Sequence, residues 1–351
     1  MLKKLKLLLS SIISLLLINP NLNLMANSKD FNMVNSITNR IIQEKDLPNL
    51  EIVDYEVLYD IELNPSYLYI KYNEGYVISS RENGVISELN LEMDNTNYDQ
   101  SACSYKIYGG PFNYICQNSI SQLTRNSDEN FESLIQRNNE FLALENSNTN
   151  LNSRDSNASF TNTIPISRMQ RYATGKWINN TTNYPPSSGY SSVGICGTIA
   201  AAGLLAYYDD YVNNNYVPDS IRTRNASTPE KLITTLFTYI DKGKNGTIVG
   251  DVKVGVNKFL TQYSSVSYTA DSSILTFSTA KTKIDAGKPV CVGMLSILGS
   301  PSNYGDHWVL AYQYKDGNTI ANDYYKVVDN HGAYTAEINV LWTSGLVYLT
   351  Q

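Results

Sequence analysis

The first half of the chain combines strand-like and helix-like patterns of apolar residues. Runs rich in aromatic and β-branched residues predict three strands, at Glu51–Leu58, Tyr67–Tyr72 and Gly75–Ser79. The short Asn73-Glu74-Gly75 connection between the last two runs predicts a hairpin. Helical spacing of apolar residues predicts helices over Ser28–Lys45 and Asp128–Leu144. This half is therefore expected to form a small α+β domain.

The second half has a different pattern. A small-residue, apolar run begins at Cys196 and predicts a buried helix. Later runs predict strands at Pro289–Met294, His307–Tyr312 and Tyr324–Val328. A turn at Lys315–Asn318 should join the last two strands as a hairpin. The fold class predicted for the whole chain is thus α+β.

A polar segment separates the two halves. From Asn146 to Thr163 the residues are mostly Asn, Ser, Thr and Asp, a composition typical of an exposed linker that proteases cut easily. We expect two folded domains, at 27–145 and 165–351, joined by a linker at 146–164. A chain of 351 residues is long enough for both, because one domain usually takes about 100–200 residues.

Residues 1–26 have the layout of a secretory signal peptide. Lys3, Lys4 and Lys6 precede the apolar stretch Leu7–Leu17, and the small residue Ala26 follows a polar region. The apolar stretch is shorter than the roughly 20 residues of a spanning helix, although an uncleaved anchor is the alternative. We expect a secreted protein with no membrane association after cleavage.

Composition narrows the function classes. With 42% hydrophobic and 17% charged residues, the chain can build a core. The net charge of −6 and the lack of a basic stripe argue against a nucleic-acid partner. We expect a monomer.

The four cysteines do not form a metal-binding pattern. None are paired as C-x-x-C, and the chain has only two histidines, so we expect neither a metal nor another cofactor. In a secreted chain Cys103 and Cys116 are the preferred disulfide pair. Cys291 lies in an apolar run and is expected to be a buried small hydrophobe.

Cys196 is the candidate nucleophile. A thiol at the start of a helix is activated by the helix dipole and by a neighbouring imidazolium. His307, at the start of a strand, is the preferred base, and His331, in a turn before Gly332, is the competing one. The hairpin should bring Asp329 beside His307 to orient the imidazole, with Asn330 as the alternate third member.

These segments resemble a known group of enzymes. The segment Gly194–Ala202 followed by Tyr207-Tyr208-Asp209 is similar to the catalytic helix of secreted bacterial papain-like cysteine peptidases, of the streptopain-type and the double-glycine (bacteriocin-processing) peptidase-like families. Gly287–Val290 followed by His307–Val309 resembles the same families. The resemblance implies a papain-like fold, with a catalytic helix packed on an antiparallel sheet. Tyr69–Ile78 looks like a streptopain-type propeptide, which favours an inhibitory first domain over a permanent binding domain.

Two positions depart from the family pattern. A glutamine commonly stands about six residues before the cysteine to supply the oxyanion hole, but here the residue is Tyr190. The remaining oxyanion-hole candidates are the Cys196 backbone N–H with Ser191, Ser192 or Asn183. The residue before His307 is Asp306, where these families often have glycine.

The sequence therefore predicts a secreted cysteine endopeptidase synthesised as a zymogen. Its partners would be protein or peptide substrates and its own propeptide, acting as an intramolecular inhibitor. Two alternatives stay open: a non-catalytic adhesin or binding protein on a papain-like scaffold, and an amidase acting on cell-wall peptides.

Overall fold

The structure is a computed structural model, which describes residues 28–60, 63–92, 104–112, 114–117, 159–161, 164–165, 195–222, 230–241, 247–273, 277–294, 307–317, 320–328 and 335–351. The chain forms two compact units, 1–50 and 51–351. The predicted signal peptide, the predicted helix at Asp128–Leu144 and most of the linker lie outside the described residues. The predicted boundaries of 27–145 and 165–351 stay a prediction.

The described part of the first unit is one helix and the turn after it. Helix α2 spans Ser28–Lys45, the residues that the apolar spacing predicts. Its buried apolar residues, Val34, Ile37 and Ile41, recur at intervals of three and four and so form one stripe. The confirmed helix shows that periodicity alone located this element.

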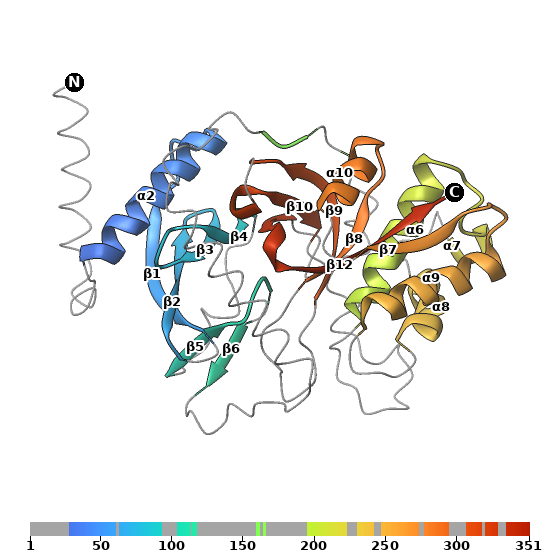
Figure 1. Cartoon of the computed structure of the whole chain (residues 1–351), viewed down its shortest axis with the longest axis horizontal. Coiled ribbons are helices and arrows are strands. Elements are labelled where there is room, and N and C mark those ends of the chain that lie inside the picture. Colours follow the sequence, from blue (N-terminus) through green and yellow to red (C-terminus); the bar gives the residue numbers. More distant parts are fainter. Residues whose placement is uncertain are drawn as a thin grey trace. The chain divides into compact units, whose positions relative to one another are not determined.

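The second unit is built on one large sheet (Figure 1). Its described strands are β1 (Ile52–Tyr59), β2 (Pro65–Tyr72), β3 (Gly75–Ser80), β4 (Ile86–Asn90), β5 (Tyr105–Tyr108), β6 (Tyr114–Gln117), β7 (Thr269–Ser273), β8 (Val290–Met294), β9 (Trp308–Lys315), β10 (Tyr324–Val328), β11 (Thr335–Asn339) and β12 (Thr343–Thr350). Their order is β6-β5-β1-β2-β3-β4-β11-β10-β9-β8-β12-β7. The neighbours are antiparallel except for β1 and β5. The α+β class is confirmed.

The first three strands confirm the predicted hairpin. Strands β2 and β3 pair from Tyr67 opposite Ser80 to Tyr72 opposite Gly75. Gly75 has φ +130°, and a Cβ there would lie 2.2 Å from the carbonyl oxygen of Asn90. Only glycine can take this position, because both the backbone conformation and the close approach exclude a side chain.

The sheet continues across the predicted domain boundary through β4 and β11. Leu89 pairs with Glu337, and Glu88 pairs with Ile338. Tyr108 of β5 also packs edge-on against Trp342, with ring centroids 5.9 Å apart. The early strands and the later strands therefore share one sheet and one hydrophobic core.

The later strands match the sequence pattern closely. All five residues of β8 are buried, and β8, β9 and β10 pair as antiparallel neighbours. The connection from β9 to β10 is more structured than the predicted turn, because the short 3-10 helix η3 (Ile320–Asn322) lies within it. A second 3-10 helix, η4 (Val340–Trp342), joins β11 to β12.

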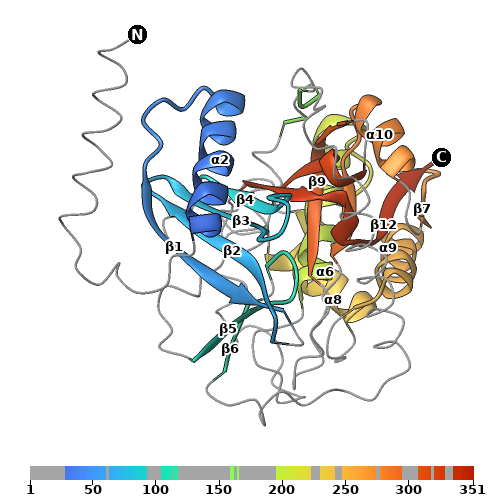
Figure 2. The same ribbon diagram turned by 60° about the vertical axis from the view of Figure 1, so that its left-hand side comes forward.

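Helices gather on the later strands, as Figures 1 and 2 show. They are α6 (Cys196–Tyr211), α7 (Asp219–Arg222), α8 (Glu230–Ile240), α9 (Val249–Tyr263) and α10 (Phe277–Asp285). Helix α6 contacts α8 and α9 as well as β8 and β9. It is therefore buried continuously from Gly197 to Asp209, and its alanines and glycines let these neighbours approach closely.

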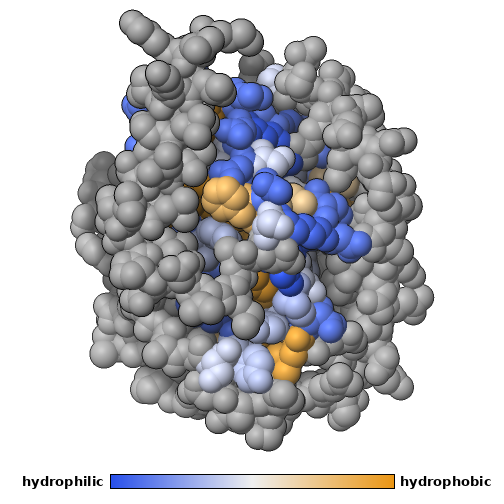
Figure 3. All heavy atoms as spheres, turned by 90° about the vertical axis from the view of Figure 1, so that its left-hand side faces the viewer, coloured by the Kyte–Doolittle hydropathy of each residue, from blue (hydrophilic) through white to orange (hydrophobic). Residues whose placement is uncertain are grey.

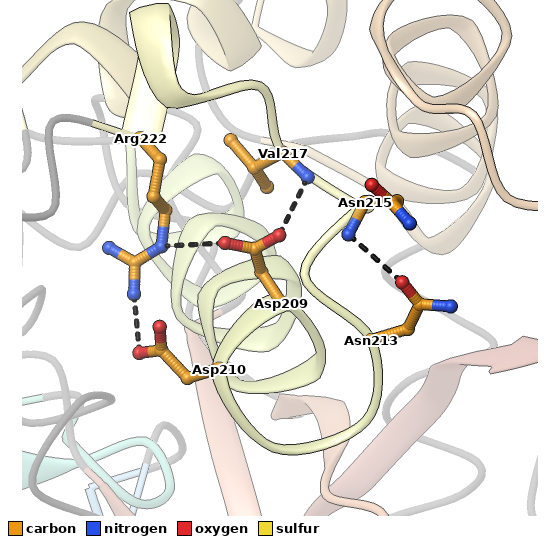
Figure 4. A network of polar contacts seen from close by, with 6 residues as sticks. All are labelled: Asp209, Asp210, Asn213, Asn215, Val217 and Arg222. Carbon is orange, nitrogen blue, oxygen red and sulfur yellow. Dashed lines mark hydrogen bonds and ion pairs between the residues drawn. The ribbon is translucent and has the colours of Figure 1, made fainter.

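An ion-pair network fixes the C-terminal end of α6 (Figure 4). The Arg222 guanidinium lies 2.6 Å from an Asp210 oxygen and 3.5 Å from an Asp209 oxygen. Asp209 also accepts a hydrogen bond from the Val217 backbone N–H at 3.1 Å. Arg222 is only 2% exposed, and these two carboxylates stabilise its buried positive charge.

The face shown in Figure 3 is mainly polar. On the face shown in Figure 3, hydrophobic residues form a few separate groups among hydrophilic ones. Large exposed hydrophobic side chains, such as Val53 and Ile248, lie in different elements. None of the helices in the described ranges has the length and apolar character needed to cross a bilayer.

Candidate active site

Cys196 lies in the first turn of α6, as predicted. The helix starts without a side-chain cap at Ile195 and without an acidic residue in its first turn. The first backbone hydrogen bond runs from Ile199 N–H to Ile195 O at 2.9 Å. The positive end of the helix dipole is therefore not neutralised by the local sequence, and it favours negative charge on the half-buried sulfur of Cys196.

The other described free cysteine has the opposite environment. Cys291 lies in the middle of β8 and is fully buried. Burial raises the pKa of its thiol far above the usual range. The prediction that Cys291 acts as a buried hydrophobe is confirmed. Cys116 is disulfide-bonded, and Cys103 lies outside the described residues.

His307 directly precedes β9, also as predicted. Its carbonyl accepts a hydrogen bond of 2.6 Å from the Met294 backbone N–H, which extends the β8–β9 pairing to His307. The side chain is half-buried. Its ring faces the ring of Phe112, with centroids 5.2 Å apart and planes tilted by 59°. An aromatic side chain from the N-terminal half thus lies against the candidate base.

Thr247 joins the nucleophile helix to the histidine strand. The Trp308 indole N–H donates a hydrogen bond of 2.9 Å to the Thr247 carbonyl. On the other side, a Cβ on Gly197 would lie 2.3 Å from the Thr247 hydroxyl oxygen. The residue after Cys196 and the residue after His307 therefore both contact Thr247. Gly197 has no side chain because Thr247 takes that space.

A buried polar pair lies behind the first turn of α6. The Thr198 hydroxyl donates a hydrogen bond to the Asp241 carboxyl group, and both residues are almost fully buried. Burial raises the pKa of Asp241 from 3.8 to about 7. The Thr198 hydrogen bond lowers this pKa, whereas the nearby Asp251 carboxylate raises it. Asp241 is therefore a second titratable group close to the nucleophile.

The Phe112 loop is held by a buried glutamate. Glu88 is fully buried and accepts hydrogen bonds from Tyr76 OH at 2.5 Å, Tyr108 OH at 3.3 Å and Phe112 N–H at 3.1 Å. Phe112 has φ +63°, which is uncommon for a residue with a side chain and occurs where surrounding contacts impose it. These contacts hold the Phe112 ring against His307.

Several predicted site residues lie outside the described part of the chain. They are Asp329, Asn330, His331, Asn183, Ser191 and Ser192. Strand β10 ends at Val328, which pairs with Leu310, three residues after His307. The roles of Asp329 and Asn330 therefore stay predictions. Within the described ranges, no group of three or more His, Cys, Asp or Glu side chains could hold a metal ion.

Sequence reasoning missed Phe112, Glu88, Asp241 and Thr247. The Gly109-Gly110-Pro111 run before Phe112 is a turn signal that marks the loop but not its contact. Thr198 was also detectable, because it is the one polar residue between Gly197 and Ala206 and a buried hydroxyl needs a partner. No local pattern identifies Asp241 as that partner, because it lies 43 residues away.

Comparison with known proteins adds one finding. No curated protein matches the chain. A family model described as the Peptidase C39-like family matches residues 166–344. The match covers half of the 351 residues, and it includes both α6 with Cys196 and β9 with the preceding His307. The chain belongs to the Peptidase C39-like family.

Proposed function

We propose that this protein is a secreted cysteine endopeptidase synthesised as a zymogen. The observation that carries the proposal is the position of Cys196 at an uncapped helix start, on a helix that meets the His307 strand at Thr247. Among the cysteines that the structure describes, Cys116, Cys196 and Cys291, only Cys196 combines a free thiol, partial exposure and this helix position. The family of the chain supports cysteine-peptidase chemistry.

The proposed reaction has two steps. The Cys196 thiolate attacks the scissile carbonyl carbon, and the protonated His307 gives its proton to the leaving amine, so a thioester forms and the C–N bond breaks. Water then attacks the thioester; His307 takes a proton from the water and returns one to the departing sulfur. Asp329 would orient His307 and steady its positive charge, with Asn330 as the alternate residue for this role.

Inhibition by the N-terminal region is the second part of the proposal. The Phe112 ring lies against His307, and β4 pairs with β11, so this region contacts both the candidate base and the later strands. Glu88 holds the Phe112 loop in this position. Cleavage in the linker at 146–164 would allow the region to leave. The active form would then consist of residues from about 165 onward.

Casein hydrolysis and mass analysis of the full-length protein test both parts. We expect the full chain to convert to a species beginning between Asn146 and Arg168, and casein hydrolysis to rise as this species accumulates. Cys196→Ala should abolish hydrolysis and stall the conversion if it is autocatalytic. Cys291→Ala is the matched control and should retain hydrolysis, because this buried thiol lies inside β8.

Each part can fail separately. A full-length protein that is fully active and never converted would refute the zymogen. A correctly folded protein that is processed by an added protease but hydrolyses no protein or peptide would refute the peptidase and favour the non-catalytic binding protein. Hydrolysis of cell-wall peptides without hydrolysis of casein would favour the amidase.

A further inference from the structure

Thr198 is the structural link between the nucleophile and a buried acid. It stands two residues after Cys196 and is fully buried in α6. A buried hydroxyl without a partner is costly, and Asp241 accepts its hydrogen bond. Asp241 directly follows the last residue of α8, and its backbone N–H bonds to Phe237 O at 3.2 Å. The first turn of α6 is thus connected to the end of α8.

The surroundings of Asp241 disfavour a negative charge. The side chain is 99% buried and lies at the C-terminal, negative end of the α8 dipole. Its Oδ1 atom has no hydrogen-bond partner, and no ion pair with a cation is found for it within the described residues. A buried carboxylate with one hydrogen bond and no cation is unfavourable, whereas a neutral carboxylic acid is tolerated.

A nearby charged group acts in the same direction as burial. Asp251, on α9, adds a like charge that raises the pKa of Asp241. The first turn of α6 contributes no acidic residue. On α7, Arg222 pairs with Asp209 and Asp210 at the opposite end of α6. With burial as the largest cause, the pKa of Asp241 reaches about 7. The acid is therefore neutral below that pH and ionised above it.

Asp241 and Thr247 each contact a residue close to one of the two candidate catalytic residues. Asp241 accepts a hydrogen bond from Thr198, two residues after Cys196, and the Thr247 carbonyl accepts one from Trp308, one residue after His307. Both Asp241 and Thr247 are buried. A change at Asp241 can therefore alter the position of the Cys196 turn through Thr198.

We propose that Asp241 is a positioning residue for Cys196, which holds the first turn of α6 through Thr198 without placing a negative charge behind the thiol. This inference rests on the proposed function and adds a regulatory property to the same site. Ionisation of Asp241 would place a negative charge behind the first turn of α6, at the carboxyl group that Thr198 binds. That charge opposes the thiolate, so the reactivity of Cys196 should decline relative to a permanently neutral variant as the pH rises through 7.

Alkylation of Cys196 by iodoacetamide between pH 5 and pH 9, followed by mass mapping, tests the inference on the full chain. Asp241→Asn keeps an acceptor for Thr198 but cannot ionise. We expect its alkylation rate, divided by that of the wild type, to rise severalfold through an inflection near pH 7. Thr198→Val should slow alkylation at every pH, and Thr198→Ser, which restores the hydroxyl, should recover the rate. Asp271→Asn, a partly exposed carboxylate of β7, is the matched control and should give a constant ratio.

A merely structural role for Asp241 would not produce a pH-dependent ratio. A ratio that stays constant from pH 5 to pH 9 overturns the inference, as does a Thr198→Val variant that reacts like the wild type. If Cys196 reacts no faster than Cys291 at any pH, the proposed function fails instead. The claim that Asp241 is a neutral buried acid is then tested by protein stability alone. If Asp241 is such an acid, the free energy of unfolding of the wild type falls relative to that of Asp241→Asn as the pH rises from 4 to 7. Curves of this free energy against pH that run parallel for the two proteins overturn the claim.

Discussion

Two buried carboxyl groups, Glu88 and Asp241, lie one contact away from the two candidate catalytic residues. Glu88 holds the Phe112 loop against His307, and Asp241 holds Thr198 in the helix turn that starts with Cys196. Their hydrogen bonding differs. Glu88 accepts hydrogen bonds from Tyr76, Tyr108 and Phe112, whereas Asp241 accepts one from Thr198, and its Oδ1 has no partner among the described residues. The structure thus stabilises the first group much better than the second.

This difference indicates different roles. The donors around Glu88 make a rigid support for the loop whose Phe112 ring contacts His307, which is what the proposed inhibitory region would need. Asp241 has one donor and is buried at the negative end of the α8 dipole. Its ionisation should therefore change with pH near neutrality. We infer that the contacts of Glu88 control access to His307, and that the protonation state of Asp241 controls the reactivity of the Cys196 thiol.

The largest expected effect comes from the candidate catalytic residues Cys196 and His307. We expect Cys196→Ala to reduce peptide hydrolysis at least about a thousandfold, because loss of a nucleophile removes the covalent step. His307→Ala should cause a loss of similar order and also slow alkylation of Cys196. His331→Ala serves as the control in a casein assay. If His331→Ala causes the larger loss of the two, His331 is the base. The Phe112 ring then does not contact the base, and the comparison of Glu88 with Asp241 fails.

The next effect is the pH dependence of stability caused by Asp241. Its pKa is about 7 in the folded state and near 3.8 when unfolded, so the folded state retains a proton that the unfolded state loses. The free energy of unfolding should therefore fall as the pH rises from about 4 to about 7, and stay level above. At 1.36 kcal/mol per pKa unit, this loss amounts to about 4 kcal/mol.

Urea unfolding of the Cys196→Ala protein, with and without Asp241→Asn, measures this loss. The Asp241→Asn variant should lack this loss. The difference between its free energy of unfolding and that of the Cys196→Ala protein should therefore be greater at pH 8 than at pH 4. A difference that does not change with pH would show that folding does not raise the pKa of Asp241.

A smaller effect is expected from Glu88→Gln. The nitrogen of the new amide group must face either a tyrosine hydroxyl or the Phe112 N–H. If it faces the Phe112 N–H, two donors oppose each other and the hydrogen bond of that N–H is lost. We expect a loss of about 1–3 kcal/mol in the free energy of unfolding of the full chain. Glu56→Gln, which alters a partly exposed pair with Lys106, should change stability by less than about 0.5 kcal/mol. Equal effects of the two variants would contradict a special role for Glu88.

The smallest effect belongs to Phe112→Ala. An aromatic contact contributes about 0.5–1.5 kcal/mol beyond its buried area, so its loss should uncover His307 and raise the activity of the full-length protein up to about tenfold. The measurement is the initial rate of peptide hydrolysis before linker cleavage. The processed form without this region should show no change. A variant with unchanged or lower initial activity would mean that the Phe112 contact is not inhibitory.

Much of the fold could be predicted from the sequence because the signals are local. The predicted helix at Ser28–Lys45 has the observed bounds, and the observed α6 begins at Cys196 as predicted. The predicted strand that starts at His307 is present from Trp308 onward, and the predicted strand that ends at Val328 is present as well. Each of these elements carries its own periodicity, so no knowledge of partners was needed.

The sheet order and the polar contacts could not be predicted in this way. The pairing of β4 with β11 joins strands from opposite ends of the second unit, and the alternation within each strand says nothing about its neighbour. The same holds for Thr198 and Asp241 and for Phe112 and His307, since each pair meets only through the fold. The candidate site residues could therefore be proposed from their chemistry, whereas the groups that contact them or their neighbours became visible only in the structure.

The most direct test of the account compares the two described free cysteines in the folded protein. Iodoacetamide at neutral pH, with mass mapping of modified peptides over time, measures the reactivity of Cys196 against that of Cys291. The account predicts that Cys196 is modified much faster, because it lies at the positive end of α6 while burial keeps Cys291 a neutral thiol. Slow modification of both cysteines at equal rates, in protein from which the N-terminal region has been removed, would contradict it.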